Sequence, residues 1–118
     1  MHKTTGLTHL INSTKYSMQG LKSAFKYETA FRHELLLGVI LVPLACYLGA
    51  DKFEKAMMIG AYLIVLVAEL LNSAVECVVD RVGTEHHVLS GRAKDQGSAA
   101  VFVALVNCAL VWILMLFF

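Results

Sequence analysis

Long runs without a charged residue constrain the fold of this chain more than any other feature of its sequence. Residues 35–50 and 97–118 contain no Asp, Glu, Lys or Arg. In residues 56–79 the charged residues are Glu69 and Glu76. A helix needs roughly 20 mainly apolar residues to cross the hydrocarbon core of a bilayer. The runs therefore predict three transmembrane helices, the first of which also uses residues before position 35.

The composition agrees with a membrane protein. Of the 118 residues, 58% are hydrophobic and 16% are charged, whereas soluble domains average about 45–50% apolar and about 25% charged residues. These values exclude a disordered chain, and a net charge of +1 gives no reason to expect a nucleic-acid partner. We expect one domain over residues 1–118, an all-α membrane protein with a surface helix at about 5–27 and transmembrane helices at about 30–50, 53–80 and 95–118.

The N-terminal segment has an amphipathic pattern. Leu7, Leu10 and Ile11 begin an apolar series at helical spacing, while Lys15 and Lys22 belong to the opposite, polar face. This pattern is typical of a helix that lies in the membrane interface. The N-terminal segment and the loop after the second span hold most of the basic residues, so both are expected to face the cytoplasm.

A polar stripe runs along the second predicted span. Glu69 is followed at three, four, seven and eleven residues by Asn72, Ser73, Glu76 and Asp80, which places all five on one helix face. An ionised side chain near the membrane centre costs roughly 2.5–3.5 kcal/mol on insertion scales, so this face is not expected to contact lipid. The immersed Glu69 is suited to accept a proton from a bilayer-dissolved molecule, and Glu76, at the boundary, to hold a hydrated cation. The alternative is that Glu69 is protonated and only bonds Asn72 or a neighbouring helix.

A second polar cluster precedes the third predicted span. Arg92, Lys94 and Asp95 are expected in a loop in which Gly91 and Gly97 allow the chain to turn. Cations beside carboxylates suit a nucleoside triphosphate with its magnesium, although such charges can also simply flank a span. The sequence contains neither GxxxxGK[ST] nor GxGxxG, so phosphoryl transfer would not use either of these nucleotide-binding loops.

Residues 68–97 carry a resemblance to a known family. Their core reads E-x-x-N-S-x-x-E-x-x-x-D-R, and residues 90–99, which overlap their end, read S-G-R-A-K-D-x-G-S-A. This run resembles the signature of the prokaryotic integral-membrane diacylglycerol kinases, and the likeness covers nearly the whole chain. It implies a homotrimeric lipid kinase of the bacterial inner membrane that transfers the γ-phosphoryl group of magnesium ATP to the primary hydroxyl of diacylglycerol, giving phosphatidic acid.

The resemblance also implies roles for individual residues. Glu69 would be the proton acceptor, Glu28 and Glu76 would hold magnesium, and Asn72 and Asp80 would support them. The implied ATP-binding residues are Tyr16, Glu28, Glu76, Glu85, His86, His87, Lys94 and Asp95. The implied substrate-binding residues are Ala30, Phe31, Arg32, His33, Glu34, Glu69, Ser98 and Trp112. One departure is His9, which stands where relatives commonly carry an arginine that touches ATP and lipid. Neutral imidazole is a weaker phosphate ligand, so the role of that arginine is not carried over to His9.

Two alternative functions follow from the same features. A polyprenol kinase, acting for example on undecaprenol, would run the same reaction on an isoprenoid alcohol. A small proton-coupled transporter would also place a glutamate in a span, but it would not need the magnesium-compatible pair of glutamates or the Lys-Asp cluster.

Overall fold

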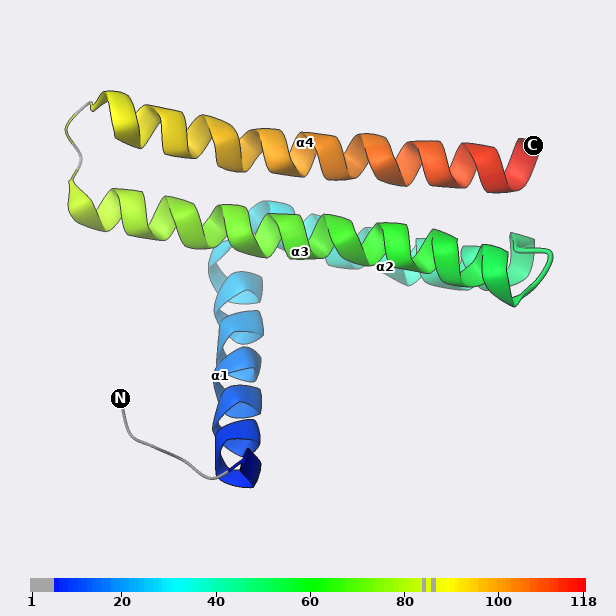
Figure 1. Cartoon of the computed structure of the whole chain (residues 1–118), viewed down its shortest axis with the longest axis horizontal. Coiled ribbons are helices and arrows are strands. Elements are labelled where there is room, and N and C mark those ends of the chain that lie inside the picture. Colours follow the sequence, from blue (N-terminus) through cyan, green and yellow to red (C-terminus); the bar gives the residue numbers. More distant parts are fainter. Residues whose placement is uncertain (1–5, 84, 86) are drawn as a thin grey trace.

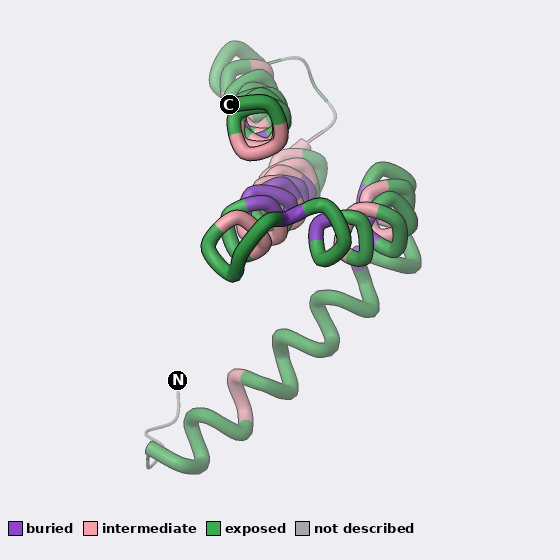
Figure 2. Tube along the Cα trace, turned by 90° about the vertical axis from the view of Figure 1, so that its right-hand side faces the viewer, coloured by how far each residue is buried: buried purple, intermediate pink, exposed green. Residues whose placement is uncertain are grey.

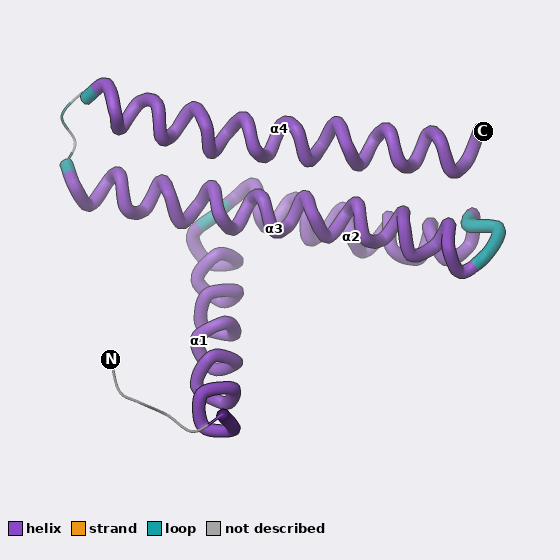
Figure 3. The backbone as a smooth tube through the Cα atoms, in the orientation of Figure 1, coloured by secondary structure: helices purple, strands orange, loops and turns teal. Residues whose placement is uncertain are grey.

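The computed structural model describes residues 6–83, 85 and 87–118 of the chain. These residues form four helices and no strand: α1 (Gly6–Tyr27), α2 (Thr29–Leu48), α3 (Lys52–Val82) and α4 (Val88–Phe117). Short connections join them (Figure 3). Helices α2, α3 and α4 are each long and apolar enough to cross a membrane. The predicted all-α membrane protein with three such helices is confirmed.

Helix α3 lies between α2 and α4 (Figures 1 and 2). Most of the buried side chains belong to it, including Met58, Tyr62, Val65 and Glu69. In the most apolar window of α4, by contrast, only 6% of the residues are buried. Most of the surface of α4 must therefore be covered by lipid or by another chain, since water would hydrate it unfavourably.

Helix α1 runs across the direction of the other three helices (Figure 1). The Arg32 guanidinium fixes the corner between α1 and α2, because it donates to the carbonyl oxygens of Phe25 (2.8 Å) and Lys26 (2.9 Å) at the end of α1. Such basic groups satisfy carbonyls that a helix end leaves without partners. An amphipathic helix held crosswise to three spans has the direction expected of one lying in the membrane surface.

Two hydrogen bonds fix the heights of the spans relative to one another. The Tyr62 hydroxyl of α3 donates to the backbone carbonyl of Glu34 in α2 at 2.7 Å. The Trp112 indole nitrogen of α4 donates to the backbone carbonyl of Met58 in α3 at 3.0 Å. Polar ends of buried aromatic residues need such partners, and each bond links two helices in the apolar region.

Helix α4 begins earlier than the sequence predicts. It starts at Val88 instead of about residue 95, so Arg92, Lys94 and Asp95 project from a helix and the predicted loop is wrong there. His87 explains the early start, because its Nδ1 atom accepts a hydrogen bond from the Leu89 backbone N–H and caps the helix. Gly91 and Gly97 are helical, and no described glycine has a positive φ, so neither glycine serves as a turn.

Candidate active site

The centre of the candidate site is a pair of carboxyl groups from neighbouring helices. Glu69 of α3 is 7% exposed, and its carboxyl group lies within hydrogen-bonding reach of the Glu34 carboxyl group of α2. The Glu34 Oε2 atom is itself buried and accepts no hydrogen bond from a described donor. The sequence predicted an immersed Glu69 but did not predict which group would face it.

Asn72 and Glu76 continue the polar stripe on the side of α3 that faces α4. The Asn72 amide nitrogen donates to the Glu76 Oε1 atom at 3.2 Å, and the Asn72 Oδ1 atom is buried without a partner. A Cβ atom added at Gly97 of α4 would overlap the Asn72 side chain. The missing side chain at Gly97 therefore allows Asn72 to lie between the helices and hold one oxygen of Glu76.

Beyond Glu76, an ion pair joins the ends of α3 and α4. Lys94 Nζ lies 2.8 Å from Asp80 Oδ1, and both side chains are substantially exposed. Exposed ion pairs are screened by water and contribute little stability, so Asp80 does not hold the Lys94 ammonium group strongly. Asp80 and Lys94 line a cavity of about 370 Å³ together with Glu85 and His87.

A second cavity is lined by α1, by α3 and by the residue that joins α1 to α2. It measures about 490 Å³ and includes Glu28, Ser17, Ser73 and Cys77 in its lining. Glu28 is the residue just before α2, and its side chain makes no capping hydrogen bond. Glu76 is not among the lining residues, and within the described part of the chain no three His, Cys, Asp or Glu side chains gather as a metal site. The two glutamates expected to hold magnesium are therefore in different surroundings in a single chain.

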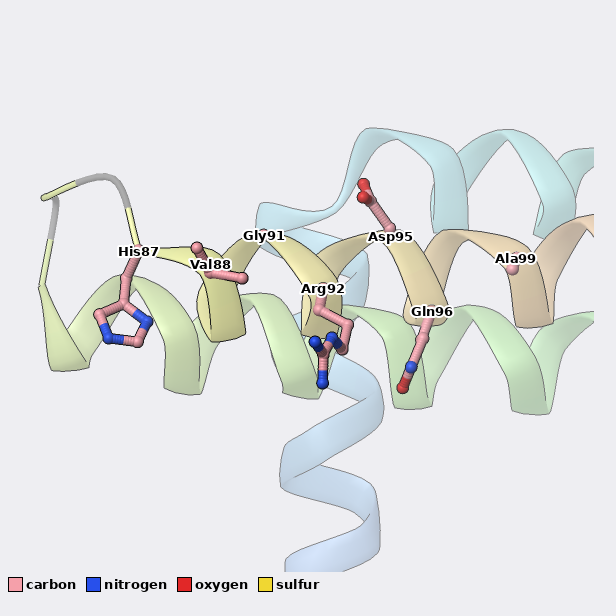
Figure 4. A pocket seen from close by; sticks show the side chains of 7 residues that line it. All are labelled: His87, Val88, Gly91, Arg92, Asp95, Gln96 and Ala99. Atoms are coloured by element: carbon pink, nitrogen blue, oxygen red, sulfur yellow. The ribbon is translucent and has the colours of Figure 1, made fainter.

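Asp95 does not line the cavity that Lys94 lines. It lines a third cavity, of about 540 Å³, with His87, Arg92 and Gln96. Figure 4 shows that all of the residues lining this cavity come from α4 and its cap, so the cavity is a surface hollow along one helix. The structure thus brings Glu85, His87 and Lys94 together but places Asp95 on the adjoining surface.

The remaining predicted residues have varied positions. Tyr16 is exposed on α1, and Ala30, His33 and Ser98 are exposed on α2 and α4. Phe31 is buried in the core, whereas Arg32 and Trp112 make the interhelical bonds described above. His86 lies outside the described residues. Of the five consecutive residues from Ala30 to Glu34 expected on the substrate side, Glu34 is the one that reaches Glu69.

Sequence reasoning missed two residues that shape this site. Tyr62 fixes the backbone beside Glu34, and Gly97 makes room for Asn72. A tyrosine in an apolar span does signal a hydroxyl that needs a partner, but the sequence does not say which carbonyl it will find. The sequence predicts a turn at Gly97, because a glycine in a helix has no distinctive local signal.

Comparison with known proteins identifies relatives of this chain over almost its whole length. Residues 15–116 match the sequence model of the family described as prokaryotic diacylglycerol kinase. A diacylglycerol kinase of Haemophilus influenzae is 68% identical over 118 residues, which is 100% of both chains. Diacylglycerol kinases of Pseudomonas aeruginosa (50% identity, 92% of this chain and 88% of the relative) and Escherichia coli K12 (44% identity, 98% and 94%) are also similar.

Proposed function

Because this chain belongs to the prokaryotic diacylglycerol kinase family and is an ATP-dependent diacylglycerol kinase, we propose that Glu69 is the base that accepts the proton of the lipid hydroxyl. The observation that carries this proposal is the burial of the Glu69 carboxyl group between α2 and α3. A hydroxyl confined just below the lipid headgroups can reach this depth, whereas a nucleotide cannot enter the hydrocarbon.

The position of Glu69 relative to the surface helix supports this role. Its partner Glu34 is in the second turn of α2, near the corner where α1 and α2 join. If α1 lies in the membrane surface, Glu69 lies close to the headgroup level. Glu76 is seven residues further along α3, a rise of about 10.5 Å at about 1.5 Å per residue, so it faces the aqueous side where ATP is dissolved.

The residues around Glu76 fit a magnesium ion. The ligands that Mg²⁺ prefers are carboxylate and other oxygen atoms together with water. Asn72 occupies one oxygen of Glu76 and leaves the other free, and the Glu28 carboxylate has no capping bond that would hold it elsewhere. When bound, magnesium would neutralise negative charge on the phosphates. Glu28 and Glu76 are the residues that we expect to hold it.

The cavity at the ends of α3 and α4 is the proposed position of the nucleotide. The Lys94 ammonium group pairs with Asp80, which is exposed and does not bind it strongly. Glu85 and His87 line the same cavity as Lys94. Phosphoryl transfer depends mainly on positioning and on charge stabilisation. In this arrangement α3 carries the base at one depth and α4 carries the phosphate-binding lysine at another.

The proposed enzyme is a homotrimer of the bacterial inner membrane with its N-terminus and active site in the cytoplasm. The basic residues of the N-terminal segment and of the α3–α4 end favour this orientation. The separation of Glu28 from Glu76 within one chain and the small buried fraction of α4 are consistent with sites completed by a second copy.

The test compares the purified chain with a Glu69→Gln variant in detergent micelles. The amide keeps the shape of the carboxylate but cannot accept the proton, so transfer to diacylglycerol should fall about 10²- to 10⁴-fold while ATP binding remains. Glu54→Gln, at the opposite end of α3, is the control. Near-normal turnover of Glu69→Gln would exclude Glu69 as the base. Separate assays of the unmodified chain with a polyprenol in place of diacylglycerol would measure its preference between the two alcohols.

A further inference from the structure

The contact between Glu34 and Glu69 has a consequence for the charge of the site. The two carboxyl groups lie within hydrogen-bonding reach, Glu69 is 7% exposed, and the Glu34 Oε2 atom is buried. A hydrogen bond between two carboxyl oxygens requires a hydrogen atom, and two carboxylates in contact away from water repel each other strongly. A pair of this kind is expected to hold one proton between its two members.

The surrounding structure holds the two groups together. The Tyr62 hydroxyl bonds the backbone carbonyl of Glu34, and a Cβ atom at Gly38, one turn later, would overlap the Tyr62 ring. The absence of a side chain at Gly38 thus allows α2 and α3 to approach closely at this height. Because the backbone of Glu34 is bonded to α3, the two helices stay close at the height of Glu34 and Glu69.

No cation neutralises this pair among the described residues. Tyr62 is the titratable group of α3 that faces Glu34 besides Glu69, and its hydroxyl already donates to the Glu34 carbonyl. On α2, the Arg32 guanidinium bonds the end of α1 and His33 is exposed. The ion pair recorded in the described part of the chain is Lys94 with Asp80. A proton would reduce the charge of the pair without a cation from another residue of the same chain.

We propose that Glu34 is a positioning residue that holds a proton and donates a hydrogen bond to the Glu69 carboxylate, so that the pair begins the reaction with one negative charge. This proposal rests on the proposed role of Glu69 as the base. In the reaction, the lipid O–H bond breaks and its proton passes to Glu69, the hydroxyl oxygen bonds the γ-phosphorus, and the bond from that phosphorus to ADP breaks. The pair then holds two protons and releases one to water before the next turnover.

The first test measures the proton directly and does not depend on activity. The infrared spectrum of the full-length chain in lipid vesicles at neutral pH, without ATP, should contain the carbonyl stretch of a protonated carboxylic acid. Glu34→Gln should lose this band, and Glu54→Gln, which removes a carboxyl group at the other end of α3, should keep it. An unchanged band in Glu34→Gln would overturn the proposal. This result is distinguishable from failure of Glu69 as the base, which would appear as an active Glu69→Gln variant.

The second test separates positioning by a hydrogen bond from a need for charge at position 34. The amide of Glu34→Gln still donates to Glu69 and the methyl group of Glu34→Ala does not, so kcat of Glu34→Gln should exceed that of Glu34→Ala about ten- to a hundredfold, the usual worth of a hydrogen bond to a charged group. The unmodified enzyme should lose activity at alkaline pH as the shared proton dissociates, and Glu34→Gln should lack this decline. Equal loss in Glu34→Gln and Glu34→Ala would overturn the proposal.

Discussion

Two glutamates on one face of α3 have different surroundings although they are only two helical turns apart. Glu69 is buried against Glu34, while Glu76 is partly exposed and bonds Asn72. Carboxyl groups of the same kind can therefore serve as a base at one position and as a cation ligand at the other. Burial and neighbouring groups decide whether the protonated or the ionised form of each is favoured. Depth along the helix separates the two roles.

The metal role is tested at single residues. Glu28→Gln and Glu76→Gln should each raise the magnesium concentration needed for half-maximal activity, since each removes an anionic oxygen ligand from a site that needs several. Magnesium titrations of the kinase reaction, with Glu54→Gln as the matched control, measure this shift. Titrations that coincide with those of the unmodified chain would assign both glutamates a structural role instead.

At the scale of helices, the contact of α3 with α4 depends on Gly97. Its missing side chain leaves the space that Asn72 occupies, and Asn72 in turn bonds Glu76. Interfaces between membrane helices are enriched in small residues because these let the backbones approach closely. In this protein the close approach also orients a candidate metal ligand.

Gly97→Ala should therefore impair the site through Asn72. The added methyl group would displace the Asn72 side chain and release Glu76, so the magnesium requirement should rise while the helix content of the chain is unchanged. Gly60→Ala is the matched control, because a Cβ atom at Gly60 of α3 meets no atom within 4 Å. Both variants should gain a little helix propensity, about 1 kcal/mol. A magnesium titration that shifts equally in both variants would contradict this role of Gly97.

The whole molecule is an open arrangement in which α3 is flanked by α2 and α4 and crossed by α1 (Figures 1 and 2). Glu28 lines the cavity at the α1 corner, whereas Glu76 bonds Asn72, which lies against Gly97 of α4. In a single copy, the cavity lined by Glu28 does not include Glu76. A site shared between copies would bring Glu28 of one chain to Glu76 of another.

Mixed oligomers test the shared site. Glu28→Gln and Glu69→Gln chains, each strongly impaired alone at the magnesium concentration that the unmodified chain needs, should recover activity when they are unfolded and refolded together in detergent. With random mixing, about a quarter of the sites would combine an intact Glu28 with an intact Glu69 from the other variant. Refolding each variant separately before mixing is the control. No recovery after subunit exchange has been verified would place Glu28 and Glu69 of each site in the same chain.

Much of the fold and part of the candidate site could be predicted from the sequence. The charge-free runs predicted three spanning helices, because the thickness of the bilayer sets a minimum length for an apolar segment. The spacing of Glu69, Asn72, Glu76 and Asp80 predicted one polar face, since helical geometry is a local property. The beginning of α4 was predicted too late, because the cap that His87 provides is not among the side chains that commonly begin helices.

The sequence by itself determined which residues lie on a common face of each helix and which segments are apolar enough to leave water. The tertiary structure alone decided that Glu69 meets Glu34, that Asn72 fits beside Gly97, and that Lys94 and Asp95 line different cavities. These contacts depend on the relative height and rotation of separate helices. Heights and rotations are set by a few close contacts, such as Tyr62 with Glu34 and Trp112 with Met58. The periodicity of apolar residues within one helix carries no information about the position of the neighbouring helix.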